Sequence, residues 1–220
     1  MDLDLNPIEE RILGCLIEKE MATPEYYPLT LNALVNACNQ KSNRHPVMAL
    51  DASTVEHTLY EMRMNRKLAI EVTSTGSRVA KYKHNMAAHW NFSPAKMAIL
   101  CELFIRGPQT PGDLRAHASR LHPMADANEV EEILQGLANH SDGPFVVHLP
   151  REPGKRERRW AHLFAGEPVP TEEQPEKHPI PEVEPMDSER VEALEAEIAR
   201  LREELGELKT AFVEFKTRFE

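Results

Sequence analysis

The chain contains 220 residues with a formal net charge of −10 at pH 7, and 41% of them are hydrophobic. This length allows one or two domains with apolar cores, and no apolar run approaches the ~20 residues that a membrane-spanning helix needs. The charge is uneven, because residues 1–166 hold 19 Lys+Arg and 20 Asp+Glu whereas residues 167–220 hold 7 and 16. The excess of acidic residues therefore lies in the C-terminal part. The net charge of the first part is close to zero, so it neither excludes binding to nucleic acid nor supports it.

The N-terminus and the cysteines favour a cytoplasmic protein. Residues 1–4 lack the basic and apolar regions of a signal peptide. The three cysteines, Cys15, Cys38 and Cys101, form no CxxC pair. Cys15 and Cys101 fall inside apolar helical patterns, which predicts buried thiols and fits a reducing compartment.

Residues 5–88 show the element order of a winged-helix module. A helix begins at Asn6-Pro7, where Asn6 can act as the cap and Glu9 can complete a capping box. A second short helix begins near Thr30, and a third opens at Asp51 or Ser53. Residues 69–73 are strand-like, residues 75–76 form a turn, and residues 78–82 return as a second strand.

The same order recurs over residues 89–166. A shift of 87 residues places Pro7 on Pro94 and Leu16 on Leu103, with Ser93 as the new helix cap. A further helix is expected from Thr110 or Pro111 to Leu121, and strands are expected over residues 145–149 and 160–164. This weak internal repeat predicts a mainly α (α+β) fold of two tandem winged-helix modules, the alternative being two unrelated three-helix segments.

The C-terminal part differs from both modules. Residues 167–187 are rich in proline and glutamate, which is typical of an extended linker without a core. Residues 188–220 predict a coiled-coil helix, because apolar residues recur at alternating spacings of three and four. These residues are Val191, Leu194, Ile198, Leu201, Leu205, Leu208, Phe212, Phe215 and Phe219. The charged residues that flank this seam favour a parallel homodimer, and the alternative is a helix that folds back on its own modules.

Long motifs of specific residues are spread over residues 5–166. They are the run from Ala37 to Arg44 with Pro46-Val47-Met48, the shorter run Thr23-Pro24-Glu25, and residues 76–82, 106–112, 143–147 and 151–157. In these motifs the chain resembles the YceH-like family of uncharacterised bacterial proteins. The resemblance implies a tandem winged-helix fold and carries no function with it.

The turn before the third helix is the first candidate for contact with nucleic acid. In a helix-turn-helix this turn lies beside the DNA backbone, and Lys41, Ser42 and Arg44 carry groups that bind phosphates. The alternative is a structural turn in which Asn39 and Asn43 bond to their own backbone. That alternative is favoured for the two asparagines, and phosphate contact is favoured for Lys41 and Arg44.

The third helix and the two hairpins provide the other candidates. His57 lies on the outer face of the third helix, although neighbouring glutamates suit phosphate poorly, and the first hairpin adds Arg78 and Lys81. The densest basic run lies on the second hairpin and consists of Arg151, Lys155, Arg156, Arg158 and Arg159. Its alternative interpretation is a solvated hairpin of mixed charge.

No metal, cofactor or enzyme motif accompanies these residues. The histidine pairs His84/His89 and His117/His122 are five residues apart, whereas ligands on one helix face are three or four apart. We therefore expect no metal, no cofactor and no enzymatic activity. The sequence predicts a DNA-binding protein, a transcriptional regulator that acts as a dimer, and the alternative is a protein–protein adaptor that uses winged-helix surfaces. A contiguous basic stripe would favour DNA, and a mixed face with exposed apolar residues would favour the adaptor.

Overall fold

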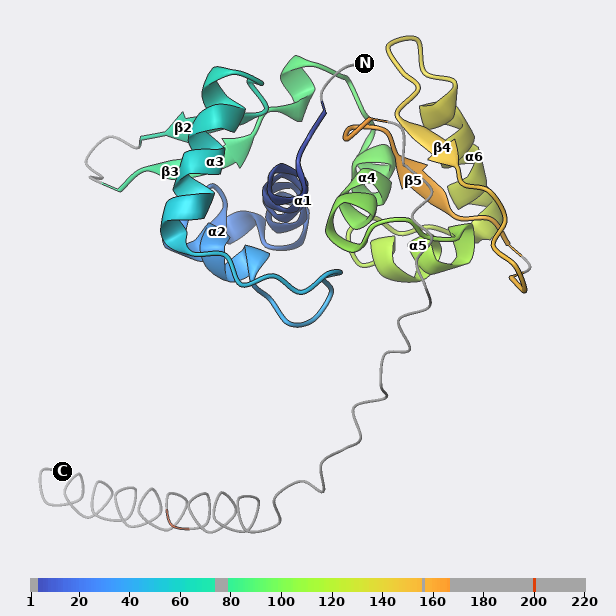
Figure 1. The fold of residues 1–220 in the computed structure, drawn as a ribbon, viewed down its shortest axis with the longest axis horizontal. Coiled ribbons are helices and arrows are strands. Elements are labelled where there is room, and N and C mark those ends of the chain that lie inside the picture. The colour runs from blue at the N-terminus through green and yellow to red at the C-terminus, as the bar shows by residue number, and fades with distance from the viewer. Residues whose placement is uncertain (1–3, 74–78, 156, 167–199, 201–220) are drawn as a thin grey trace, which may run out of the picture. The chain divides into compact units, whose positions relative to one another are not determined.

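The protein is described here by a computed structural model (Figure 1). The structure describes residues 4–73, 79–155, 157–166 and 200. The chain divides into two units, residues 1–170 and residues 171–220, and all the elements given below belong to the first. The predicted linker and coiled-coil helix therefore lie outside the described residues, apart from Arg200.

The first segment, residues 5–88, contains three helices and a small sheet. The elements are α1 (Pro7–Ala22), η1 (Pro24–Tyr26), β1 (Leu29–Thr30), α2 (Leu31–Cys38), α3 (Ala52–Met64), β2 (Ala69–Val72), β3 (Lys81–His84) and η2 (Met86–Ala88). The strands are antiparallel in the order β1-β3-β2, with Ala69 opposite His84 and Leu29 opposite Tyr82. The sequence predicted the β2–β3 hairpin, but it placed the second strand at residues 78–82, before its observed position.

The second segment, residues 89–166, repeats this order of three helices and an antiparallel hairpin. Its elements are α4 (Pro94–Arg106), α5 (Pro111–Ala118), α6 (Ala127–Ala138), β4 (Val146–His148) and β5 (Trp160–His162). Val146 lies opposite His162, and a single bridge joins Gln109 to Trp160 on the far edge of β5. The protein is thus a mixture of helices and small antiparallel sheets.

Local capping explains where the helices begin. The Asn6 side chain accepts hydrogen bonds from the amides of Ile8 and Glu9, and the Glu9 carboxylate accepts one from the Asn6 amide at 2.9 Å. This capping box satisfies amides that the first helical turn leaves without partners. Ser93 caps α4 in the corresponding position, which confirms both predicted helix starts.

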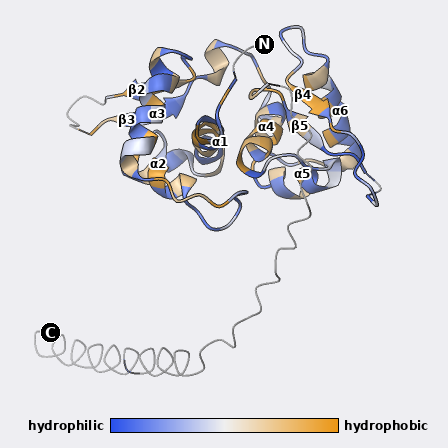
Figure 2. Ribbon diagram, in the orientation of Figure 1, coloured by the Kyte–Doolittle hydropathy of each residue, from blue (hydrophilic) through white to orange (hydrophobic). Residues whose placement is uncertain are grey.

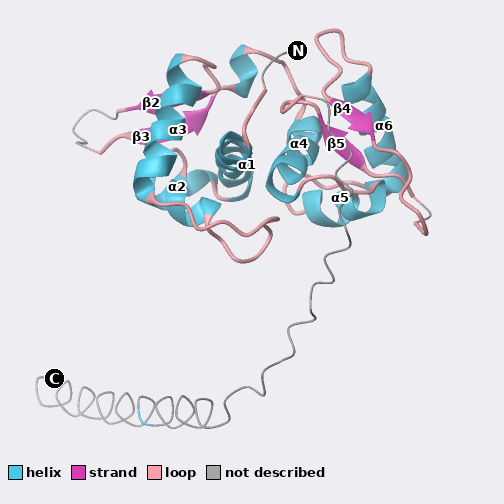
Figure 3. Ribbon diagram, in the orientation of Figure 1, coloured by secondary structure: helices cyan, strands magenta, loops and turns pink. Residues whose placement is uncertain are grey.

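One hydrophobic core joins the two segments, because buried residues of both belong to a single cluster. Helices α1 and α4 pack against each other at its centre (Figure 2), and the two small sheets lie on opposite sides of this pair (Figure 3). Gly14 allows the close approach, since a Cβ atom there would lie only 2.5 Å from Ile105 Cγ2. Within the described residues, no helix is both long enough and apolar enough to cross a membrane. The proposed boundary between residues 88 and 89 stays a prediction.

Candidate interaction surfaces

Residues 39–50 connect α2 to α3, and we call them the connecting loop. Asn39 closes this loop at its base, where its side chain donates to Leu50 O and accepts from Leu50 N, both at 2.7 Å. The loop is also tied to the second segment, because His45 N donates to Ile105 O at 2.9 Å and the Arg106 guanidinium donates to the Asn43 side chain. The connecting loop is therefore held at its base and at its far end.

Arg44 holds the same loop from inside the protein. The residue is only 6% exposed, and its guanidinium donates to both carboxylate oxygens of Glu18 on α1, at 3.2 and 2.5 Å. It also donates to the carbonyl oxygens of Ala37 and Asn43. The predicted contact between Arg44 and phosphate is therefore wrong, because this charge is enclosed and already paired.

A second buried arginine, Arg11 on α1, supports the loop in a similar way. Its two terminal nitrogens donate to Cys38 O at 3.0 Å and Pro46 O at 2.7 Å. Two guanidinium groups thus fix the backbone of one short connection. The outward residues of this connection, including Lys41 and Ser42, are exposed as predicted and are presented by a well-anchored backbone.

Charged side chains continue from Arg44 across the contact between the two segments. Arg120 donates to Glu18 at 2.7 Å and to Glu102 on α4 at 2.8 Å, and Arg106 lies 3.1 Å from Glu102. Burial alone would raise the pKa of the Glu18 carboxyl, but the hydrogen bond and charge of Arg44 outweigh it and lower this pKa to about 2. The network thus keeps Glu18 ionised and links the two segments.

The outer face of α3 carries apolar rather than basic side chains. Tyr60 and Met64, one turn apart, are 52% and 51% exposed. His57 is exposed beside them, as expected, and it lines a hollow of about 460 Å³ together with Glu61 and other polar residues. Both arginines near the end of α3, Arg63 and Arg66, are about a quarter exposed and are engaged with carboxylates of the protein.

These two arginines form ion pairs within the protein. Arg63 pairs with Glu71 on β2 at 2.7 Å, and Arg66 pairs with Glu9 on α1 at 2.6 Å. On the first hairpin, Lys81 is half-buried in β3. Arg78 lies outside the described residues. The described part of the first segment therefore gives no contiguous basic stripe along α3.

Helix α6, the counterpart of α3, is acidic. Its 12 residues include Glu129, Glu131 and Glu132 and contain neither lysine nor arginine. Glu131 accepts a hydrogen bond from the indole nitrogen of Trp160 on β5 at 3.1 Å, so it also fixes the hairpin to the helix. This helix offers no cation to a phosphate.

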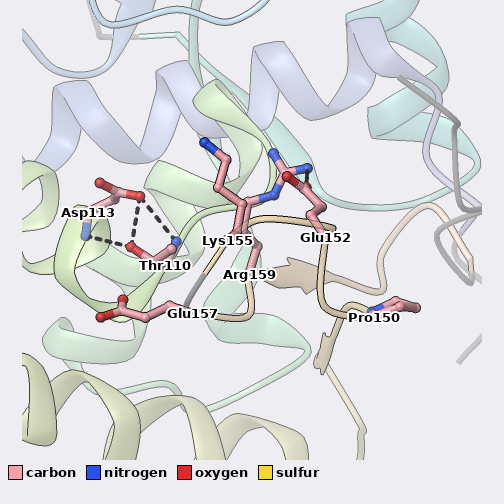
Figure 4. Close-up of a pocket in the computed structure, with 7 residues that line it drawn as sticks. All are labelled: Thr110, Asp113, Pro150, Glu152, Lys155, Glu157 and Arg159. Atoms are coloured by element: carbon pink, nitrogen blue, oxygen red, sulfur yellow. Dashed lines mark hydrogen bonds and ion pairs between the residues drawn. The ribbon is translucent and has the colours of Figure 1, made fainter. Parts of the chain in front are cut away.

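The second hairpin presents the largest number of exposed basic residues. Arg151, Lys155 and Arg158 are exposed, whereas Arg159 pairs with Glu152. Arg156 lies outside the described residues. Lys155 and Arg159 line a hollow of about 360 Å³. Carboxylates line it too, including Asp113 at the start of α5, and Figure 4 shows how these side chains lie. The positive charge of the hairpin is thus partly balanced within the protein.

Comparison with known proteins assigns the family. Residues 5–155 match the family described as "Protein of unknown function, DUF480". The chain belongs to this family. The resemblance inferred from the sequence motifs, to uncharacterised bacterial proteins, is confirmed.

The relatives are bacterial proteins named UPF0502. One from Geobacter sulfurreducens is 51% identical over the full length of both chains, and one from Pelobacter propionicus is 45% identical over the full length of both. One from Photobacterium profundum is 49% identical over 76% of this chain and 77% of its own length. These names assign no activity to the relatives.

The sequence provided no indication of the charged residues that anchor the connecting loop and join the two segments. Glu18, Arg11 and Arg120 carry no motif, and their partners lie up to 102 residues away in the chain. The exposure of Tyr60 and Met64 could have been predicted from the helical periodicity. Both lie out of phase with the buried series Val55, Leu59 and Met62 of the same helix, so an apolar residue on the outer face could have been noticed.

Proposed function

We propose that this protein is a non-enzymatic adaptor, built from two tandem winged-helix modules, that binds another protein through the outer face of α3. Three helices followed by an antiparallel hairpin, found in both segments, support the tandem winged-helix assignment. The shared core and the ionic network between the segments would present the two modules as one rigid surface.

The observation that carries the proposal is the composition of the two third helices. In a DNA-binding winged helix, the third helix enters the major groove and needs cations near the phosphates. Here α6 has no cation, and the one arginine of α3 pairs with Glu71. Tyr60 and Met64 instead expose apolar side chains of the types that are enriched in protein interfaces.

Binding of DNA is the second candidate, and the exposed Arg151, Lys155 and Arg158 of the second hairpin favour it. Such binding would be electrostatic, so the removal of one cation from a phosphate should lower the slope of affinity against salt by roughly 0.9. Replacement of Arg156, Arg158 and Arg159 together, with affinity measured against salt, tests this role. An unchanged slope would exclude the second hairpin from any DNA contact.

We further propose that the adaptor acts in the cytoplasm as a parallel homodimer through residues 188–220. The support is the heptad pattern of the sequence, since this segment lies outside the described residues. Two adaptors on one dimer would bind a repeated or symmetric partner with increased avidity. Truncation after Pro185 should convert the protein to a monomer in solution, and a truncated dimer at the same concentration would refute the coiled coil.

Photo-crosslinking tests the adaptor proposal. A benzoylphenylalanine is placed at position 60 in living cells, with position 36 as a matched control because Asn36 is exposed on α2. We expect one specific cross-linked protein from position 60 and none from position 36. The Tyr60→Ala change combined with a probe at position 64 should weaken the same cross-link.

The purified protein is tested in parallel with short mixed-sequence duplex DNA. We expect no binding at physiological salt in the 10⁻⁴–10⁻⁶ M range that is typical of non-specific DNA binders. Salt-sensitive binding in that range, together with equal cross-linking from positions 36 and 60, would overturn the adaptor in favour of DNA binding.

A further inference from the structure

The outer face of α3 combines apolar side chains with carboxylates. Tyr60 and Met64 lie one helical turn apart and are about half exposed. Residues three or four apart are neighbours on the surface of a helix, so Glu56 borders Tyr60 and Glu61 borders Met64. The two glutamates lie on opposite sides of the apolar pair. We call these four residues the α3 patch.

Neither glutamate of the α3 patch is neutralised within the described part of the protein. Glu56 and Glu61 form no ion pair there, and the hydrogen bond that Glu61 accepts comes from the uncharged Asn65 side chain. The arginines at the end of the helix do not compensate these charges, because Arg63 and Arg66 each bind a carboxylate of another element. The α3 patch therefore carries an excess of negative charge.

A hollow of about 460 Å³ opens beside the α3 patch. It is lined by Glu61 and His57 of α3 and by residues at the start of α1, including Glu9. Arg66 also lines the hollow, and it binds Glu9 at 2.6 Å, so these two charges cancel. With histidine neutral, Glu61 holds the remaining formal charge among the described lining residues. The hollow therefore favours a cation over an anion.

Helix α6 shows which of these features are specific to α3. Glu132 is exposed on α6 and, in the part of the chain that the structure describes, it forms no ion pair either. However, none of the exposed large apolar residues of that part lies on α6. Glu132 is thus a surface carboxylate without an apolar neighbour of this kind, and it provides a control for the α3 patch.

We propose that the α3 patch binds a basic amphipathic segment of a partner protein. An apolar side chain of this segment packs on Tyr60 and Met64, and a lysine or arginine one turn away enters the hollow and pairs with Glu61. The apolar contact provides most of the affinity, while the ion pair selects basic over acidic segments. Such a segment would belong to the partner of the adaptor proposed above, so the inference rests on that function.

Two other occupants match the α3 patch less well. Nucleic acid would bring phosphates against carboxylates that repel them. A second copy of this chain would offer the cations of its second hairpin, Arg151, Lys155 and Arg158, but none of the exposed large apolar residues of the described chain lies on that hairpin. A partner that carries cations and apolar side chains in one segment matches both features of the patch.

Peptide selection tests the chemistry of the partner. Random dodecapeptides displayed on phage are selected against the purified full-length protein, and the selected sequences are measured as synthetic peptides by fluorescence anisotropy. We expect lysine or arginine three or four residues from a large apolar residue. Glu61→Gln, which keeps the shape of the side chain, and Glu61→Lys should both weaken binding, the second about tenfold. Glu132→Lys makes the same change in net charge as Glu61→Lys and should leave binding unchanged.

The outcomes separate the basic partner from the adaptor function. Acidic or uncharged peptides that lose binding on Tyr60→Ala would keep the α3 patch as an interface and refute its basic partner. Equal effects of Glu61→Lys and Glu132→Lys would refute the pairing with Glu61, because net charge alone would then account for the loss. Peptides that bind without Tyr60, or a selection that yields no peptide, would refute the patch as a protein-binding surface and the adaptor proposal with it.

Discussion

Gly14→Ala should destabilise the protein, although alanine is the better helix former. In an unconstrained helix interior this change gains ~1 kcal/mol. At Gly14, the new Cβ would lie 2.5 Å from Ile105 Cγ2 and 2.9 Å from Phe104 Cβ, about 1 Å short of ordinary contact. A Cβ atom of α4 cannot move without its backbone, so α1 and α4 would have to separate. Overpacking of this kind costs ~1–3 kcal/mol. Because the gain in helix propensity offsets ~1 kcal/mol of this cost, we expect a net loss of about 1 kcal/mol.

Gly136→Ala on α6 is the matched control. The nearest atoms to a Cβ at this position are Lys96 Cε and Nζ, at 3.7 and 3.8 Å, so the methyl group fits. This variant should gain up to ~1 kcal/mol from helix propensity. The free energy of unfolding of both variants is measured by urea titration with one fixed probe. A Gly14→Ala protein that is as stable as the control would mean that α1 and α4 do not approach as described.

Three further predictions concern the ionic network and the α3 face. Arg44→Met should cost ~3–5 kcal/mol, because Glu18 then remains as a poorly compensated buried charge, whereas Arg158→Met at the surface should change stability by less than ~0.5 kcal/mol in the same urea titration. Glu18 has a folded-state pKa of about 2 against an ordinary 4.5, so its contribution is present above pH 4.5 and is lost as the pH falls toward 2. The stability difference between wild type and Glu18→Gln should shrink over that range, and a constant difference would contradict the pairing. Tyr60→Ala should change stability by less than ~1 kcal/mol, since the side chain is exposed, and a larger loss would mean that Tyr60 packs in the core.

Local features of the sequence predicted the helices well, because their signals are carried by adjacent residues. Asn6 with Glu9, and Ser93 with Pro94, fix their helix starts through bonds within one turn. Strand limits were predicted less well. The two-residue strand β1 is too short for a period-two pattern, and it forms only because β3 lies beside it, more than 50 residues later in the chain.

The interpretation of Arg44 failed for a related reason. Its position in a polar turn is the same for an arginine that binds phosphate and for one that turns inward. The inward orientation of Arg44 is set by Glu18, which lies 26 residues earlier in the chain. Arg120 of the second segment binds the same carboxylate. No residue near Arg44 in the sequence indicates that Glu18 or Arg120 is its neighbour in the fold. The asparagine of the same turn was interpreted correctly, because Asn39 bonds to a backbone that it closes locally.

The connecting loop is fixed by contacts from both segments. Its backbone is anchored by Arg11 and Arg44 from inside the first segment and by Ile105 O from α4, so it cannot shift without breaking bonds to both segments. A loop anchored in this way presents Lys41 and its neighbours in one conformation. The conformational entropy of the loop is therefore lost when the protein folds, and no further loss is needed when the loop binds a partner.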